Sequence, residues 1–250
     1  MKTIKILSSE VSFVSKETLD VLVSQCRNYK EEYVIVTNTQ NQFLAYKDDL
    51  FSKVHENAFF RISDSVILKY LALFLGEKNL PEVKLGSKLM LDICEKASNL
   101  NLNIGLLGDT EDNLIKLRRN LEQKFTKIHI PYSYSPPFRE LTDKENSRII
   151  DEINLANVDI LFVSLGCPKQ ERWMYYHSHR ISSLSFGVGA AFTFIAKPET
   201  EVPTFFHKVG LGWFIRFLSN PKKFFIRYFV HGLSFIILVL IDKFKTKLKA

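Results

Sequence analysis

The chain has 250 residues, of which 46% are hydrophobic and 24% are charged, a composition that suits one folded α/β domain with an appendage and excludes wholesale disorder. Its formal net charge of +7 is uneven, because residues 203–250 hold nine lysines and arginines against one acid, which makes +8 there and leaves −1 for residues 1–202. A basic charge confined to the end of the chain argues against a uniformly basic nucleic-acid binder.

The first residues and the cysteines indicate the setting of the chain. Residues 1–13 contain two lysines but no continuous apolar run, so we expect no secretory signal there. The three cysteines, Cys26, Cys94 and Cys167, are widely spaced and form no CxxC pair. This spacing argues against a disulfide framework or a structural zinc site and favours a reducing compartment.

Short apolar runs alternate along the chain with longer segments of helical periodicity. We expect strands at residues 33–37, 59–62, 103–107, 127–130, 159–163 and 183–187. We expect helices at 66–75, 87–99, 110–125 and 143–155, where apolar residues recur every three or four positions. Such alternation, with strands that are almost continuously apolar, predicts an α/β fold with a mostly parallel sheet covered by helices on both sides.

Two stretches interrupt this alternation. Residues 131–137, rich in tyrosine, serine and proline, are expected to form a loop. Between residues 197 and 203 two prolines flank two glutamates, and the composition then becomes aromatic and basic. We therefore predict a boundary there, with a sheet domain at 1–202 and a C-terminal helical appendage at 203–250.

The segment 203–250 contains 11 of the 32 aromatic residues, interleaved with lysine and arginine. Such a segment lies in a lipid headgroup layer, packs on a core as a helical subdomain, or binds single-stranded nucleic acid. Residues 235–241 are almost purely aliphatic, which suits lipid or a core better than bases. The longest charge-free apolar stretch, 228–241, has 14 residues. A spanning helix needs ~20, so this stretch is expected to be interfacial or buried.

Polar residues and glycines follow several of the predicted strands, and ligands bind at the carboxyl ends of open parallel sheets. Asp64 lies between one such strand and a predicted helix. Its position favours a helix N-cap, although it also suits a general base if Ser63 or Ser65 caps the helix instead. Thr37 and Asn38 follow another strand, as do Gly187 and Gly189.

Gly105 and Gly108 surround the end of another predicted strand, where glycine lets backbone N–H groups approach an anionic ligand. The stretch is neither a complete GxGxxG nor a P-loop, and glycine is also ordinary in a tight strand-to-helix turn. The turn at 165–171 is more specific. Gly166 and Pro168 predict a sharp turn with the proline at the first helical position, followed by Lys169, Gln170 and Glu171 at the mouth of the sheet. A lysine there opposes the helix dipole, which points to an anion, although an exposed polar turn is an equal alternative.

Other chemistry is disfavoured by spacing. His177 and His179 are two residues apart and share no helix face, and the chain has no HExxH motif, so we expect no metal site. Cys167 has no evident histidine partner, and a packed thiol is expected there. The absence of a GxSxG motif argues against an α/β-hydrolase.

Taken in order, these motifs resemble the WecG/TagA/CpsF family of glycosyltransferases (GT26), over roughly residues 10 to 230. The most specific motif is GxPKQExW, here Gly166 to Trp173. The resemblance also rests on Thr37-Asn38, Asp64, Gly86-Ser87, the 105–108 turn, Pro136-Pro137-Phe138, residues 159–165, Gly187-Val188-Gly189, Trp213, Arg216 and residues 221–228.

The resemblance implies a membrane-associated bacterial enzyme with a Rossmann-like sheet and a C-terminal helical appendage that helps to form the active site. Such enzymes move a sugar from a UDP-sugar to a polyprenyl-diphosphate-linked acceptor, with inversion, without a bound metal and without a cofactor, in the synthesis of cell-surface polysaccharides. It places the chain on the cytoplasmic face of the membrane, bound to anionic lipid through 203–250, with self-association left open and no nucleic-acid partner.

Carried over by position, Asp64 matches the family's proposed catalytic base, and Thr37 and Asn38 match its substrate-pocket pair. Gln170 and Glu171 match residues near the nucleotide, and Arg216 and Arg227 match arginines thought to meet the diphosphate. The predicted site is therefore catalytic Asp64 and Thr37, with binding by Asn38, Gly105, Gly108, Lys169, Gln170, Glu171, Gly187, Gly189, Arg216 and Arg227.

Several positions depart from the family pattern, and they leave donor identity open. These departures are also compatible with an alternative function, a catalytically degenerate, membrane-bound adaptor that binds a nucleotide. The departing residues are Ser65, Lys88, Thr193, Glu201, Gly212, Lys222, Lys223 and Ile226.

Overall fold

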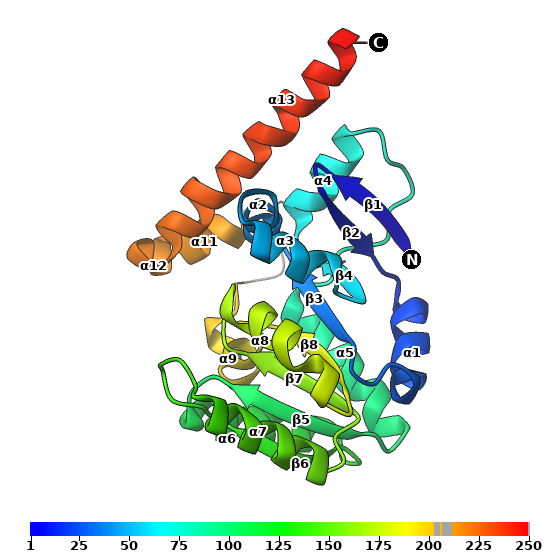
Figure 1. Ribbon diagram of the computed structural model, residues 1–250, viewed down its shortest axis with the longest axis vertical. Helices are drawn as coiled ribbons and strands as arrows, with labels where there is room; N and C mark the ends of the chain where they lie inside the picture. The colour runs from blue at the N-terminus through cyan, green and yellow to red at the C-terminus, as the bar shows by residue number, and fades with distance from the viewer. Residues whose placement is uncertain (203–205, 207–211, 250) are drawn as a thin grey trace.

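The computed structural model describes residues 1–202, 206 and 212–249, without the side chains of 212, 216, 219, 223 and 246–249 (Figure 1). Among these residues, eight strands form one sheet in the order β1-β2-β4-β3-β8-β7-β5-β6. The strands are parallel except for β1, which pairs antiparallel with β2. The structure confirms the predicted α/β fold with a mostly parallel sheet.

The strands are β1 (Lys2–Ile6), β2 (Ser9–Phe13), β3 (Tyr33–Thr37), β4 (Phe60–Ser63), β5 (Asn103–Gly108), β6 (His129–Tyr134), β7 (Ile160–Ser164) and β8 (Leu184–Gly187). The helices of the sheet domain are α1 (Lys16–Ser24), α2 (Thr39–Lys47), α3 (Asp49–Glu56), α4 (Val66–Phe74), α5 (Gly86–Asn99), α6 (Glu111–Lys124), α7 (Asp143–Leu155), α8 (Lys169–His177) and α9 (Ala191–Ala196), with short 3-10 turns η1 (Cys26–Asn28), η2 (Ser178–Arg180) and η3 (Pro198–Thr200). The appendage contains α11 (Gly212–Ser219), α12 (Pro221–Phe225), the π-helical segment η4 (Ile226–Gly232) and α13 (Leu233–Lys249).

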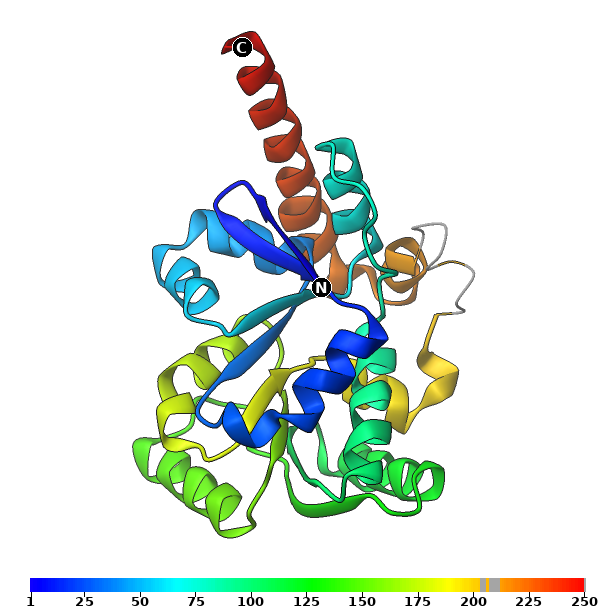
Figure 2. The same cartoon turned by 90° about the vertical axis from the view of Figure 1, so that its right-hand side faces the viewer.

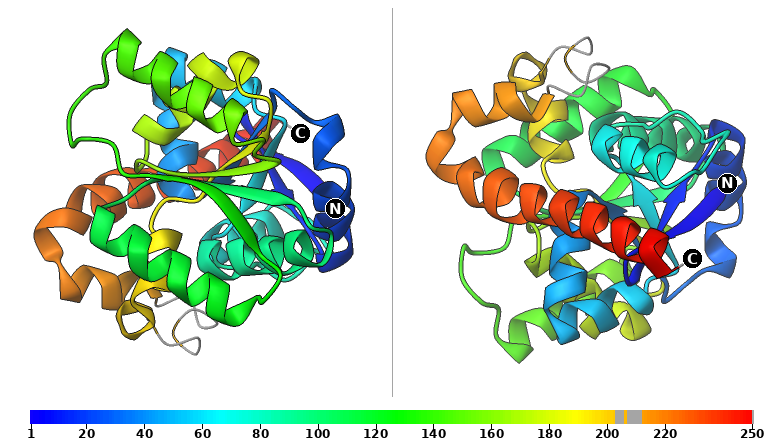
Figure 3. Two further views of the ribbon diagram at one scale, coloured as in Figure 1. Left: turned by 90° about the horizontal axis from the view of Figure 1, so that it is seen from below. Right: turned by 90° about the horizontal axis from the view of Figure 1, so that it is seen from above.

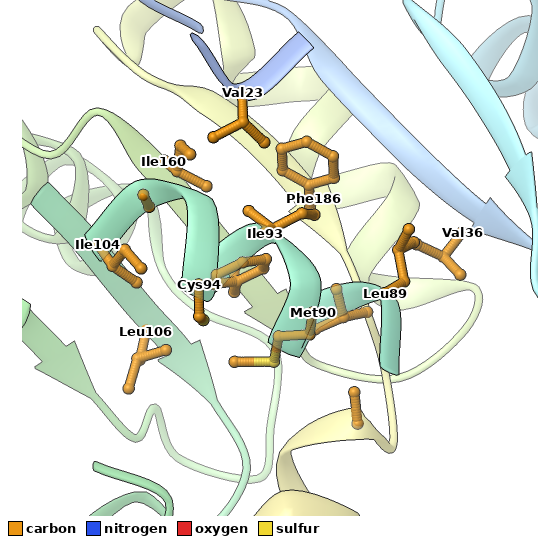
Figure 4. Packing of buried hydrophobic residues seen from close by; sticks show 14 of the residues in the cluster. Val23, Val36, Leu89, Met90, Ile93, Cys94, Ile104, Leu106, Ile160 and Phe186 are labelled. Atoms are coloured by element: carbon orange, nitrogen blue, oxygen red, sulfur yellow. The ribbon is translucent and has the colours of Figure 1, made fainter. Parts of the chain in front are cut away.

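Helices cover both faces of the sheet, because alternate residues of each parallel strand point to opposite sides and both sides are apolar. In β3, Val34 and Val36 join the cluster under α1, α5, α6 and α9, whereas Tyr33 and Ile35 join the cluster under α2, α3, α7 and α8. Figure 4 shows the first cluster, in which Leu89, Met90 and Ile93 of α5 lie against Val36, Ile104, Ile160 and Phe186 of the strands.

A third apolar cluster joins the appendage to the start of the chain. Phe235 and Val239 of α13 are buried against Ile6 and Val11 of the β1–β2 hairpin and Leu68 of α4. Figure 2 shows α13 running past this hairpin and projecting beyond the body of the protein. The described helices include none with the length and apolar character that crossing a bilayer requires.

The predicted strands and helices are all present, and most ends agree within two residues. The loop predicted over 131–137 is wrong for its first four residues, because β6 continues through Pro131 to Tyr134. β6 is an edge strand that pairs with β5 alone, and a proline without an N–H is tolerated at such an edge. The β1–β2 hairpin and helices α1 to α3 were not predicted.

Candidate active site

A cavity of about 910 Å³ opens at the carboxyl ends of the parallel strands. Its walls are the segments that follow β3, β4, β5, β7 and β8, the loop 136–141 after β6, and α11 to η4 of the appendage. Both the place and the size suit a small-molecule ligand. Figure 3 shows, in its left panel, the helix layers on either side of the sheet and the appendage curving round one edge.

The wall after β3 is built on Asn38, which caps α2 with its side-chain oxygen at 2.9 Å from the Gln40 N–H. Because the cap uses that oxygen, Nδ2 is the atom that Asn38 offers to a ligand. Thr37 lies one residue earlier, is fully buried, and accepts a hydrogen bond from Gln42 Nε2 at 3.1 Å. Thr37 is not among the residues that line the cavity, and its carbonyl accepts from the Asp64 N–H instead.

Asp64 follows β4 and lines the cavity with a half-buried side chain. The N-cap of α4 is Ser65, whose hydroxyl accepts from the Leu68 N–H at 3.4 Å, so the preference for Asp64 as the cap is wrong. The carboxylate faces Gly86 at the start of α5, since a Cβ there would lie 3.4 Å from Asp64 Oδ2. A Cβ at position 86 would therefore be in van der Waals contact with the Asp64 carboxylate.

The predicted glycines divide into two groups. Gly105 and Gly108 do not line the cavity: a Cβ on Gly108 would lie 2.3 Å from the Ser164 carbonyl, and one on Gly105 would touch Val158 and Leu161 at 3.0 Å. They let β5 pack closely against its neighbours. Gly189 lines the cavity with a φ of +53°, and Gly187 lies behind it, where a Cβ would meet Met174 at 2.7 Å.

The turn after β7 brings Lys169, Gln170 and Glu171 to the cavity, as predicted, in the first turn of α8. Pro168 is the N-cap of this helix, so its predicted place at the first helical position is wrong, and Lys169 occupies that position. Gln170 is 3% exposed and Glu171 is fully buried, and Gln170 Nε2 donates to Glu171 Oε1 at 2.8 Å.

Glu171 is held by Asn41 of α2, whose Nδ2 donates to Oε1 at 3.1 Å. Burial raises the pKa of Glu171, while the donors from Gln170 and Asn41 oppose that shift. Glu171 Oε2 and Gln170 Oε1 have no hydrogen-bond partner among the described residues. Two buried acceptors at a cavity wall suit a ligand that brings hydroxyl or amide donors.

Cys167 lies beside this pair, and Asn41 Nδ2 is 3.4 Å from its sulfur. Burial raises the pKa of the thiol well above its usual value, Glu171 raises it further, and Arg227 acts in the opposite direction. The thiol is therefore protonated at neutral pH, which agrees with the expected packed thiol rather than a nucleophile.

The appendage closes one side of the cavity with Trp213, Phe224, Arg227 and Tyr228. The Arg227 guanidinium lies 5.7 Å from the centre of the Tyr228 ring, which holds the cation at the wall. Arg216 belongs to α11, and its side chain lies outside the described residues.

The family model described as "Glycosyl transferase WecG/TagA/CpsF family" matches residues 4–249. The chain belongs to this family. It is similar to two curated proteins named N-acetylglucosaminyldiphosphoundecaprenol N-acetyl-beta-D-mannosaminyltransferase. The one from Staphylococcus aureus (strain MW2) is 27% identical over 136 residues, which cover 54% of this chain and 52% of the relative. The one from Bacillus spizizenii is 23% identical over 195 residues, which cover 78% and 74%. The chain thus spans about half the length of the Staphylococcus relatives that it matches.

Three of the residues that the sequence analysis gave as departures from the expected family pattern make contacts of their own. The Thr193 hydroxyl donates to Asp109 Oδ2 at 2.9 Å, and both residues line the cavity. The Ser87 hydroxyl donates to Glu201, and Lys88 pairs with Asp92 within α5. Each replacement is thus joined to a neighbour in this member of the family.

Sequence reasoning missed Asn41 and assigned no role to Asp109, which follows β5. Asn41 is the third residue of α2, and its capping box with Asn38 is a local signal, but its contact with Glu171 joins residues 130 positions apart. Asp109 has a left-handed φ of 59° and binds Thr110, Asn113 and Thr193. Within the described part of the chain, histidine, cysteine, aspartate and glutamate form no group of three or more that could hold a metal.

Proposed function

We propose that the chain is an inverting, metal-independent glycosyltransferase that moves a sugar from a UDP-sugar to a polyprenyl-diphosphate-linked saccharide in the synthesis of bacterial cell-surface polysaccharide. The observation that carries this proposal is Asp64, a carboxylate on the cavity wall at the end of β4 whose capping role is taken by Ser65. Membership of a glycosyltransferase family supports it, and the names of the two relatives favour an N-acetylhexosamine as the sugar.

In this mechanism Asp64 accepts the proton of the acceptor hydroxyl while that oxygen attacks the anomeric carbon of the donor. The bond between the anomeric carbon and the diphosphate breaks on the opposite face, so the configuration inverts. Two hydrogen bonds fix the backbone around Asp64 for this step. Its own N–H donates to the Thr37 carbonyl, and the Ser65 hydroxyl caps the first turn of α4, which follows directly.

The departing diphosphate needs compensation for its negative charge. Lys169 at the start of α8 and Arg227 of the appendage both line the cavity and supply cations there. Asn38 Nδ2 donates to the ligand, and the unpartnered oxygens of Gln170 and Glu171 accept from hydroxyl or amide groups of the sugar.

The proposed place of action is the cytoplasmic face of the membrane, where a polyprenyl-linked acceptor is held. The appendage supports this placement, since residues 203–250 carry the +8 charge and a third of the aromatic residues.

The test is to incubate the protein with a panel of UDP-sugars and a short-chain polyprenyl-diphosphate sugar and to measure product by mass spectrometry. Asp64→Asn is expected to reduce turnover by about 10²- to 10⁴-fold, the usual contribution of a general base. The matched control is Asp151→Asn, an exposed carboxylate on α7. Near-normal turnover by Asp64→Asn would remove Asp64 from the mechanism.

The second candidate function is a nucleotide-binding adaptor at the membrane. Thr193 and Glu201, two positions that depart from the expected family pattern, favour it, because both make hydrogen bonds within the chain at or beside the cavity. Tight UDP binding with no transfer to any acceptor across the panel would support the adaptor over the enzyme.

A further inference from the structure

Helix α4 has an unusual surface for a helix that flanks a sheet. Its sequence is VILKYLALF, in which Lys69 is the one charged residue. Leu68, Leu71 and Ala72 are buried in the cluster with the hairpin and α13. The opposite face is also apolar, with Leu73 43% exposed and Phe74 42% exposed. A helix that is apolar all round is normally covered on all sides, so this face requires an occupant.

A second exposed apolar surface runs along the appendage beside it. Its residues recur at helical spacing and are 44–60% exposed: Val230, Leu233, Ile237, Ile241 and Phe244. The two surfaces meet at Lys243, whose ammonium lies 3.9 Å from the centre of the Phe74 ring and donates to the Phe74 carbonyl. Figure 1 and the right panel of Figure 3 show α4 and α13 side by side at one end of the molecule.

We propose that α4 of the sheet domain, together with α13, forms one surface that lies in the headgroup layer of an anionic membrane. Charge decides between lipid and a second copy of the chain. The surface carries Lys69, Lys243 and Lys245 against one neighbouring acid, Asp242, and the appendage is +8 overall. Two copies face to face would bring these charges together, whereas anionic headgroups complement them and the apolar side chains enter the acyl boundary.

The position of α4 gives this surface a consequence for the cavity. Val66 and Ile67 in the first turn of α4 line the cavity, and Asp64 lies just before that turn. Leu73 is seven residues beyond Val66, about 10 Å along the helix axis. One helix therefore connects the residues that face the lipid to the wall of the cavity beside Asp64. This step rests on the proposed function, since a polyprenyl-linked diphosphate lies at headgroup level.

The experiment measures co-sedimentation of the full chain with vesicles of phosphatidylcholine alone and of phosphatidylcholine with phosphatidylglycerol. Leu73→Gln removes apolar surface without adding charge, and its exposed position keeps the core intact. We expect about tenfold weaker binding to anionic vesicles, as for Ile237→Gln on α13. The matched control is Leu155→Gln, since Leu155 is 81% exposed on α7 and lies away from this surface.

Unchanged binding by Leu73→Gln beside a loss by Ile237→Gln would overturn the role of α4. Sedimentation of the wild type as a dimer that Leu73→Gln dissociates, with no vesicle binding, would assign the face to a second copy and also overturn the proposal. Transfer to a water-soluble short-chain acceptor without vesicles is measured in parallel. Retention of that activity by Leu73→Gln separates failure at the membrane from failure of the proposed chemistry.

Discussion

Glu171→Gln is expected to make the protein more stable and less active. The wild-type carboxyl is fully buried, and Oε2 has no hydrogen-bond partner among the described residues. Glutamine has the same shape, and its oxygen can accept the two hydrogen bonds that Oε1 receives from Asn41 and Gln170. The substitution removes a buried charge, because a neutral amide nitrogen replaces Oε2, and we expect a gain of about 1–3 kcal/mol in the free energy of unfolding.

The pH dependence follows from the direction of the pKa shift. Burial raises the pKa of Glu171 in the folded state above its ordinary value of 4.5. The folded protein therefore binds more protons than the unfolded chain above pH 4.5, and stability falls as pH rises through the folded-state pKa. The gain in stability from Glu171→Gln is accordingly small below pH 4.5 and grows as pH rises from 4.5 through the folded-state pKa of Glu171.

The assay is urea unfolding of wild type and Glu171→Gln from pH 4 to pH 8, with Glu82→Gln, an exposed carboxylate, as control. A gain of about 2 kcal/mol corresponds to a rise of 4–8 °C in Tm for a chain of this size. Loss of UDP-sugar turnover together with that gain would identify a residue kept for function at a cost in stability. A variant that is less stable at pH 7, with the pH slope of the wild type, would refute the reasoning.

Two further predictions concern packing and titration elsewhere. Phe235→Ala is expected to lower the free energy of unfolding by about 3–5 kcal/mol and Tm by on the order of 10 °C, since Phe235 is fully buried under the hairpin. Phe244 is 60% exposed on the same helix, so Phe244→Ala should leave Tm nearly unchanged. Equal melting temperatures of the two variants would contradict this packing. Burial, aided by the charge of Arg61, lowers the pKa of His55 to about 3. Between about pH 6.5 and about pH 3 the unfolded chain therefore binds a proton at this imidazole that the folded protein does not, and stability falls as pH drops through this range. His55→Gln should flatten that part of the curve relative to the exposed control His179→Gln, and parallel curves for the two variants would count against a buried neutral imidazole.

The parts of the fold that sequence predicted are those with a strong local pattern. Strands of a parallel sheet are buried on both faces and read as continuous apolar runs, so 33–37 was predicted to the residue. The β1–β2 hairpin was missed because polar residues interrupt the apolar ones in both strands. Part of their apolar surface is buried by α13, which comes more than 200 residues later in the chain. Pro131 argued for a loop, and only its place on an edge strand allows it to belong to β6.

The residues of the candidate site likewise divide into those that the sequence predicted correctly and those that it did not. Asn38, Asp64 and the turn at 169–171 were found because the residues that follow parallel strands meet at one end of the sheet, and all of them line the cavity. Gly105 and Gly108 follow the same rule but serve strand packing, since the space that they leave is filled by Val158, Leu161 and Ser164. No local pattern indicates that Asn41 contacts Glu171, because that contact depends on how α2 and α8 lie relative to each other on one face of the sheet.

The charge of the appendage acquires two separate roles once the chain is folded. Arg227 lines the cavity, and its charge opposes the rise in the pKa of the Cys167 thiol. Lys243 faces the surface that α13 shares with α4, where it meets the Phe74 ring. The burial of Phe235 and Val239 between these two positions fixes both to the sheet domain. In the proposed function, a lipid-linked diphosphate would therefore meet positive charge on its way to Asp64, because one helical segment carries cations both at the proposed membrane surface and at the cavity.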